Sequence, residues 1–177
     1  MTDTDILERL YHKLESTSGR NVFGVLGPTY QALARFAGQL RLGKMPDGRP
    51  FPTPLSVTRG ILATIPDHEF HDLVQNEARY PVPTRKQVEV AFQRFVRDSF
   101  AKTSGLVILE HLELLYAYTL DFALFRGLAT NTHSLLLLLP GTREGGSPRL
   151  FPADQSGRAY VLPPQLIVES HLWELQD

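Results

Sequence analysis

The stretch 105–142 (GLVILEHLELLYAYTLDFALFRGLATNTHSLLLLLPGT) constrains the fold of this chain more than any other part. It contains a continuous apolar run that ends in Glu110 and a second such run at 135–139, which is followed by Pro-Gly-Thr. Continuous apolar runs are typical of parallel strands that are buried on both faces, and the crossover between parallel neighbours usually contains a helix. The stretch therefore predicts a strand, a helix and a second strand within a parallel sheet.

The rest of the chain alternates strands and helices in the same way. Helical periodicity or capping residues indicate helices at 4–16, 30–42, 67–79 and 84–102, and β-rich pieces occur at 21–26, 149–151, 158–162 and 165–169. A Pro/Gly-rich loop at 43–54 is too close to the N-terminus to separate two domains. We therefore predict a single α/β domain over residues 1–177, with a mainly parallel sheet flanked by helices and a helical middle at 67–102.

The composition excludes several classes of protein. Hydrophobic residues make up 42% and charged residues 21%, as in ordinary folded domains, and the formal net charge is −1. There is no cysteine, so disulfides, thiol catalysis and cysteine-bound zinc are excluded. The longest uninterrupted apolar run is far too short to cross a bilayer, and the charged start of the chain has no apolar signal region. We expect a cytoplasmic protein with no membrane partner.

The turn Gly27-Pro28-Thr29 is the first candidate ligand site. It follows a short strand and precedes a helix, which is where a phosphate-binding loop lies in nucleotide-hydrolysing proteins. The second glycine, the lysine and the following Ser/Thr of such a loop are missing. Gly27 and Thr29 are thus candidate cofactor-binding residues, and a plain turn without a ligand is the alternative interpretation.

Polar residues at the ends of the two long strands are the second candidate. In P-loop enzymes an acid at the end of a core strand orients the metal and the attacking water, which is the role that Glu110 would have in an NTPase. Thr142 follows the next strand, where it is a candidate for sensing the γ-phosphate of a nucleotide, and Arg143 could contact phosphate within the chain or across an oligomer. The alternatives are that Glu110 is polar because strand ends reach solvent, and that Pro-Gly-Thr-Arg is a glycine turn after a buried strand.

Two further patterns are weaker. His68 and His71 are spaced i, i+3 rather than i, i+4, and no third ligand accompanies them, so we expect no metal site. Basic residues recur along the helix at 84–102, where Glu89 and Asp98 interrupt them. This pattern leaves two interpretations, a solvated helix face and a weak nucleic-acid-binding surface.

The run 106–168 resembles the small P-loop-type (BrxF-like) or BrxB-type components of bacteriophage-exclusion (BREX) defence systems. The matching pieces are an apolar strand with an IELLF-like continuation at 106–116, a strand that ends in Pro-Gly at 135–141, and a tail at 150–162. The resemblance implies a P-loop or AAA+-like core, here with a degenerate phosphate loop. It also implies a cytoplasmic antiviral role in an assembly with a PglZ-type phosphatase-like protein and a DNA methyltransferase.

We therefore expect a non-catalytic or weakly nucleotide-binding subunit of a phage-resistance complex, with no obligatory cofactor. One alternative is a Mg-ATP-dependent NTPase that uses Glu110, Thr142 and the turn at Gly27. Another is a DNA-binding accessory subunit that uses the helix at 84–102.

Overall fold

The computed structural model describes residues 1–16, 21–151 and 160–176. Its strands are β1 (Val22–Gly27), β2 (Leu55–Ser56), β3 (Gly105–Glu110), β4 (His133–Glu144), β5 (Ser147–Leu150), β6 (Tyr160–Val161) and β7 (Leu172–Glu174). Its helices are α1 (Asp3–Glu15), α2 (Tyr30–Leu42), α3 (Val57–Thr64), α4 (Asp67–Asn76), α5 (Pro81–Lys102), α6 (Glu113–Ala117), α7 (Ala123–Leu128) and the short 3-10 helix η1 (Glu169–His171).

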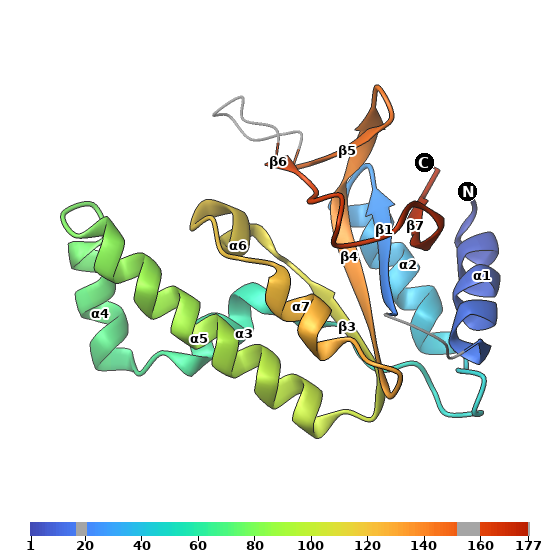
Figure 1. Ribbon diagram of the computed structural model, residues 1–177, viewed down its shortest axis with the longest axis horizontal. Coiled ribbons are helices and arrows are strands. Elements are labelled where there is room, and N and C mark those ends of the chain that lie inside the picture. The colour runs from blue at the N-terminus through green and yellow to red at the C-terminus, as the bar shows by residue number, and fades with distance from the viewer. Residues whose placement is uncertain (17–20, 152–159, 177) are drawn as a thin grey trace.

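One sheet organises the molecule, in the strand order β2-β3-β4-β1-β7, and all neighbours along this path are parallel. β4 lies at the centre, between β3 and β1, and it continues beyond the parallel region into an antiparallel extension with β5 and β6. The predicted α/β fold with a mainly parallel sheet is confirmed. Figure 1 shows α1 and α2 on one face of this sheet and α3, α5, α6 and α7 on the other.

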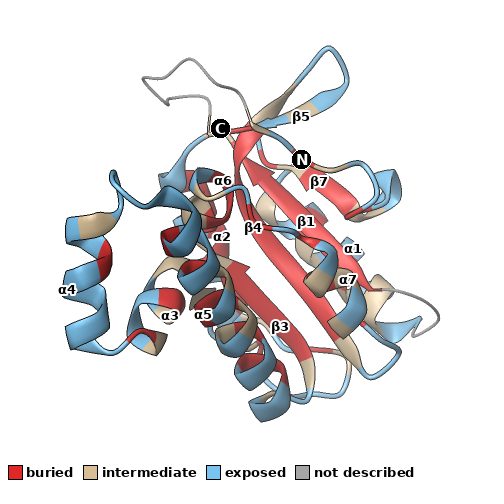
Figure 2. Cartoon of the chain, turned by 60° about the vertical axis from the view of Figure 1, so that its left-hand side comes forward, coloured by how far each residue is buried: buried red, intermediate tan, exposed pale blue. Residues whose placement is uncertain are grey.

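The core is formed by alternate residues of the central strands, which point to opposite faces of the sheet. Leu136 and Leu138 of β4 pack towards α1 and α2, whereas Leu135, Leu137 and Leu139 pack towards the helices of the other face. All five leucines are at most 1% exposed, and Figure 2 shows the three central strands as the most deeply buried part of the chain. Burial of each such side chain stabilises the fold by about 1.5–3 kcal/mol.

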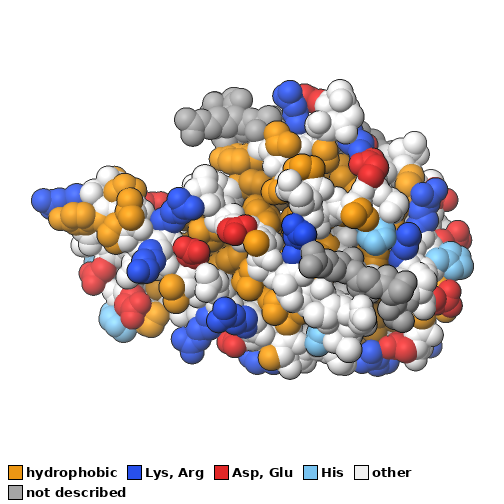
Figure 3. Space-filling model, in the orientation of Figure 1, with side chains coloured by type: hydrophobic (Ala, Val, Ile, Leu, Met, Phe, Trp, Pro, Cys, Tyr) orange, Lys and Arg blue, Asp and Glu red, His pale blue; other side chains and the backbone are white. Residues whose placement is uncertain are grey.

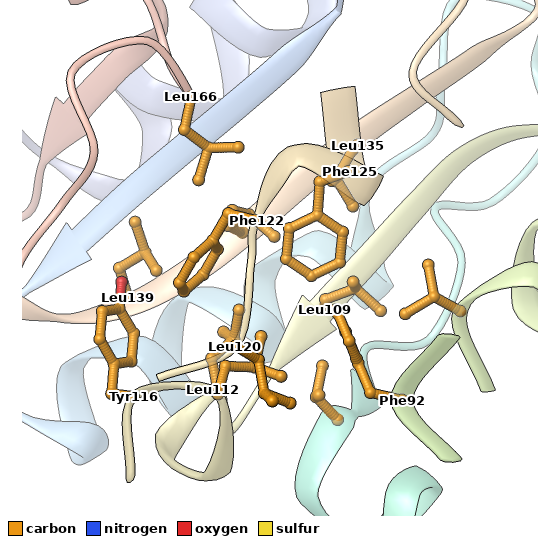
Figure 4. Packing of buried hydrophobic residues seen from close by; sticks show 14 of the residues in the cluster. Phe92, Leu109, Leu112, Tyr116, Leu120, Phe122, Phe125, Leu135, Leu139 and Leu166 are labelled. Atoms are coloured by element: carbon orange, nitrogen blue, oxygen red, sulfur yellow. The ribbon is translucent and has the colours of Figure 1, made fainter. Parts of the chain in front are cut away.

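Aromatic side chains fill the space between the sheet and the helices α5, α6 and α7. Phe92 of α5 meets Phe125 of α7 edge-to-face, with ring centroids 5.5 Å apart, and Phe122 contacts both Phe125 and Tyr116. Figure 4 shows these rings beside Leu109, Leu135 and Leu139 of the sheet. This second face is therefore a packed aromatic core.

Several elements differ from the sequence prediction. Helix α5 begins at Pro81, before the expected Thr84, because prolines at 81 and 83 lie in the first turn, where no backbone N–H bond is needed. Two short helices, α6 and α7, replace the single predicted crossover helix. The β-rich piece at 165–169 is not a strand. The edge strand β7 lies further along, and residues 158 and 159 of another predicted piece lie outside the described residues.

β4 also differs, because it does not end before Pro140. It continues through Gly141, Thr142 and Arg143 to Glu144, and these residues pair with β5. Pro140 has no backbone N–H, so no hydrogen-bond acceptor is required at this position. Its carbonyl accepts a hydrogen bond of 2.8 Å from the Phe151 N–H. The expected turn after this strand is therefore an extended hairpin.

Candidate functional site

The carboxyl ends of β1, β3 and β4 meet at one edge of the sheet. Gly27 at the end of β1 pairs with Pro140 of β4, and Leu109 of β3 pairs with Leu137 on the other side of β4. The helix that follows β1 covers one face, and the helix that follows β3 covers the other. In open α/β sheets, a crevice where the connections diverge in this way is the usual place for a ligand.

The turn after β1 is too short to enclose a phosphate group. Only Pro28 and Thr29 separate β1 from α2, and the Thr29 side chain accepts a hydrogen bond of 3.1 Å from the Ala32 N–H. The Leu33 N–H bonds to the Thr29 carbonyl at 3.2 Å. A Cβ at Gly27 would lie 2.6 Å from Leu33 Cγ, so glycine allows the helix to pack closely on the strand. The N–H groups of Ala32 and Leu33 are thus committed to bonds within the helix start.

Glu110 ends β3 beside a residue of unusual backbone conformation. Its Oε1 lies 3.6 Å from His111 Nδ1, and its side chain is 30% exposed. His111 has φ +54°, which is uncommon for a residue with a side chain. The His111 carbonyl accepts hydrogen bonds from the N–H and the hydroxyl of Thr58, at 3.1 and 2.8 Å. The start of α3 therefore holds the end of β3 in place.

Tyr30 and Glu113 connect the two sides of this crevice. The Tyr30 hydroxyl donates a hydrogen bond of 2.6 Å to Glu113 Oε1, and the Tyr30 ring stacks on His111 with centroids 6.3 Å apart. The Thr58 hydroxyl lies 3.4 Å from Glu113 Oε2. Partial burial is the main cause that raises the pKa of Tyr30 above its usual range, and the hydrogen bond to Glu113 and the charge of Glu113 raise this pKa further. Tyr30 and Thr58 were missed by sequence reasoning, because no spacing rule relates them to Glu113.

A cleft of about 370 Å³ opens between α2 and the ends of β3 and β4. Its polar side chains are Tyr30, Arg41, Glu110 and His111. The rest of its lining is apolar or small, from Leu33, Ala34, Ala37 and Gly38 of α2 and from Leu138 and Pro140 of β4. The cleft therefore offers one cation, one carboxylate and one imidazole to a ligand.

The four predicted cofactor-binding residues separate into two pairs. Gly27 and Thr29 lie at the carboxyl edge with Glu110, as expected. Thr142 and Arg143 lie on the β4–β5 hairpin, where Thr142 pairs with Arg149. The Arg143 guanidinium is bound to the C-terminal segment, at 2.7 Å from Glu169 Oε1 and 3.3 Å from the Leu172 carbonyl.

The basic residues of α5 are exposed, and they lie beside different parts of the chain. Arg85 donates a hydrogen bond of 2.8 Å to the Thr119 carbonyl, whereas Lys86 and Arg94 line a groove beside α4.

Within the ranges 1–16, 21–151 and 160–176, no three His, Asp or Glu side chains gather as a metal site would require. None of the described helices combines the length and apolarity needed to cross a membrane.

No protein-family model matches this chain, and neither a curated protein nor a solved structure shows significant similarity to it.

Proposed function

We propose that this chain is a non-catalytic subunit of a multi-protein antiphage defence assembly, built on a P-loop-like sheet with a degenerate phosphate turn. The P-loop-like interpretation is supported by the placement of two features at one edge of the sheet. The turn after β1 and the acid at the end of β3 lie on either side of the central strand β4. A nucleotide site needs both, one for phosphate and one for the metal and water.

The two-residue connection between β1 and α2 is the observation that carries the non-catalytic assignment. A phosphate loop works by wrapping successive backbone N–H groups around the phosphates and by supplying a lysine. Pro28 has no N–H, and Thr29 caps the helix. The Tyr30–Glu113 hydrogen bond joins α2 to α6 beside the same edge. Without a wrapping loop or a lysine, the turn lacks the groups that bind phosphate in a nucleotide site.

The assembly role is supported by the resemblance of the run 106–168 to BREX components and by the exposed apolar surface of the helical middle. A fold that keeps its sheet but loses its phosphate loop can still present helix faces to partner proteins. A PglZ-type phosphatase-like protein is the partner that the resemblance favours. The defence assignment would be tested by co-expression of the two proteins, followed by affinity purification of one and detection of the other.

Thermal unfolding with Mg-ATP tests the non-catalytic assignment. A ligand present at about 100 times its Kd stabilises a protein by about 2.7 kcal/mol, which corresponds to a shift of about 5–10 °C for a chain of this size. We expect no shift at millimolar Mg-ATP, and complex formation that is the same in wild type and Glu110→Gln. A shift that Glu110→Gln abolishes would instead establish the NTPase alternative.

The cleft that contains Glu110 and His111 is the observation that favours this NTPase alternative, because it places a carboxylate beside the start of α2. The DNA-binding alternative is favoured by the exposed Arg94 and Arg97 of α5. Binding of duplex DNA that weakens steeply with salt, and that Arg94→Ala/Arg97→Ala abolishes, would establish that alternative.

A further inference from the structure

Helix α4 and the start of α5 form an arm that projects beyond the sheet, whereas the rest of α5 packs on the sheet through Phe92, Val96 and Phe100. Figure 1 shows α4 at the end of the molecule opposite α1, and Figure 3 shows the same region as a separate lobe with orange apolar and blue basic side chains together. Leu73 is the only buried residue of α4. We call residues 67–102 the α4–α5 arm. Most of the surface of α4 therefore faces solvent or a partner.

Exposed apolar side chains are concentrated on this arm and on the preceding helix α3. Six of the ten exposed large apolar residues in the described part of the chain lie between positions 62 and 90. They are Leu62, Phe70, Val74, Tyr80, Val82 and Val90. Isolated apolar residues on a surface need no explanation, but a concentration on one projecting element is typical of a protein-binding surface.

A groove of about 530 Å³ lies on the arm between the start of α4 and the exposed face of α5. Its floor is apolar, with Ile65 and Ala91 buried and Val90 57% exposed. Lys86 and Arg94 lie on the α5 side, and Glu69 lies on the α4 side. Neither Lys86 nor Arg94 forms an ion pair with another described residue. The groove thus combines an apolar floor with two cations that have no carboxylate partner among the described residues.

Two hydrogen bonds join the turn between α4 and α5 to the residues that follow α6. The Tyr118 hydroxyl donates a hydrogen bond to Glu77, and Arg85 donates one of 2.8 Å to the Thr119 carbonyl. These contacts hold the turn between α4 and α5 against the end of α6. Arg85 lies between Pro83 and Lys86 of the groove, so its bond limits the conformational entropy that is lost when the groove is filled.

We propose that the groove between α4 and α5 binds an acidic amphipathic helix of a partner protein. The proposal rests on the assembly role given above and names the chemistry of the partner. A helix can lay its apolar face on a groove between two helices, and its flanking carboxylates then meet cations on the sides of the groove. Lys86 and Arg94 are eight residues apart on α5, or about 12 Å along its axis. Carboxylates about two turns apart on the incoming helix match this spacing.

The charges of the groove distinguish this occupant from two others. A second copy that docked arm to arm about a two-fold axis would bring the same cations to both sides of the interface, which is unfavourable. Duplex DNA requires a contiguous basic face, whereas Glu69 and the apolar floor interrupt this one. An acidic amphipathic helix can pack its apolar face on the floor of the groove and pair its carboxylates with Lys86 and Arg94.

The test uses the full chain and a synthetic amphipathic peptide of about 20 residues, long enough to form a helix. Leucines at i, i+3, i+4 and i+7 form one face of this peptide, and glutamates occupy the other. A matched peptide carries lysine in place of every glutamate. We expect the acidic peptide to bind at least tenfold more tightly than the basic one in fluorescence anisotropy. Equal binding of both peptides, or no binding of the acidic one, would overturn the proposal.

Two matched variants of α5 locate the contact. Arg94→Glu reverses a charge on the groove, and Arg97→Glu makes the same change at an exposed position of the same helix that does not line it. We expect Arg94→Glu to weaken binding of the acidic peptide about fivefold or more, whereas Arg97→Glu leaves it nearly unchanged. Val90→Gln should also weaken binding, because it removes apolar contact without adding charge. Equal effects of Arg94→Glu and Arg97→Glu would overturn the proposal.

Complex formation separates a failure of this inference from a failure of the proposed function. If the PglZ-type partner binds wild type and Arg94→Glu equally, and the peptide does not bind, the assembly role stands but the groove is not its site. If no partner binds but the peptide result holds, the groove binds acidic helices and the defence assignment fails. Self-association of the chain that Val90→Gln abolishes would show that a second copy occupies the groove, which contradicts the proposal.

Discussion

The hydroxyl of Tyr30 donates a hydrogen bond of 2.6 Å to Glu113 Oε1, so the first residue of α2 is joined to the first residue of α6 beside the carboxyl edge of the sheet. The two residues are 83 positions apart in the chain. The bond connects helices on opposite faces of the sheet and lies beside the place where a nucleotide-binding protein would hold phosphate.

The change Tyr30→Phe tests whether this bond contributes to stability. We expect the free energy of unfolding to fall by about 0.5–1 kcal/mol, because Tyr30 is about half exposed and part of the interaction is replaced by water. Tyr80→Phe is the matched control, since Tyr80 is 48% exposed and its hydroxyl bonds to no other described residue. Chemical denaturation of both variants checks the difference. Equal losses in the two variants would show that the Tyr30 hydroxyl adds nothing.

Arg143 allows a structural role to be separated from a ligand-binding one. Arg143→Ala should lower the free energy of unfolding by about 1 kcal/mol or more, because its partly buried guanidinium bonds to Glu169 and to the Leu172 carbonyl. Arg149→Ala removes an exposed pair with Glu144 and should cost at most about 0.5 kcal/mol. Hydrogen exchange should also become faster in β7 in the Arg143→Ala variant alone. Unchanged exchange in β7 would contradict the structural role.

The sheet could be predicted from the sequence because its central strands are buried on both faces. Such strands are continuous apolar runs, and the helices between them require parallel neighbours. The edge strand β7 has three residues, so it has too few positions for a pattern to be recognised. The sequence predicts α5 from Thr84, three residues too late, because prolines usually interrupt a helix, whereas Pro81 and Pro83 lie in its first turn, where proline is tolerated.

The candidate site could be predicted only where it depends on strand ends. Gly27 ends β1 and Glu110 ends β3, and both strands run parallel to β4, which lies between them. Their position at one edge of the sheet therefore follows from the fold. The pairing of Tyr30 with Glu113 depends on how α2 and α6 pack, which no local spacing encodes. The continuation of β4 past Pro140 depends on pairing with β5, and this pairing moves Thr142 and Arg143 onto the hairpin.

Gly141 is a position where the β4–β5 hairpin has no room for a side chain. A Cβ at Gly141 would lie 2.3 Å from the Arg149 carbonyl oxygen and 3.0 Å from Leu150 Cα, which are backbone atoms that cannot move independently. We expect Gly141→Ala to lower the free energy of unfolding by about 1–3 kcal/mol. Differential scanning calorimetry measures this change.

Gly127→Ala is the matched control for Gly141. It adds the same methyl group in α7, where nothing lies within 4 Å of the new atom. Alanine is a better helix former than glycine, so this variant should be more stable than wild type by up to about 1 kcal/mol. A loss of stability in Gly127→Ala, or none in Gly141→Ala, would contradict the packing described for these positions.

The contact between Phe92 and Phe125 joins α5 to α7, and a double-mutant cycle measures its contribution. Both rings are at most 1% exposed and meet at 89°. We expect each single change to leucine to cost about 1–2 kcal/mol, and the coupling energy to be about 0.5–1.5 kcal/mol. A cycle of Phe92 with Phe36, which packs on the other face of the sheet, should be additive within about 0.5 kcal/mol. Equal coupling in both cycles would contradict a direct contact.

Tyr118 should make stability depend on alkaline pH. Partial burial, followed by the hydrogen bond and the charge of Glu77, raises the pKa of Tyr118 from 10.0 to about 12 in the folded protein. Between these two values the unfolded chain loses the tyrosine proton and the folded protein keeps it. The free energy of unfolding should therefore fall as the pH rises from about 10 to about 12, and the contribution of Tyr118 is complete below pH 10.

The variants Tyr118→Phe and Glu77→Gln isolate this contribution from that of the other tyrosines. Denaturation midpoints measured across the same pH range should fall less steeply in Tyr118→Phe than in wild type, because phenylalanine has no proton to lose. Glu77→Gln should give an intermediate slope, since it removes the carboxylate charge but leaves Tyr118 partly buried. Parallel slopes in wild type and Tyr118→Phe would show that the arm is not held to α6 through this hydroxyl. The hydrogen bond from Arg85 to the Thr119 carbonyl would then remain as the described polar contact between the arm and the segment after α6.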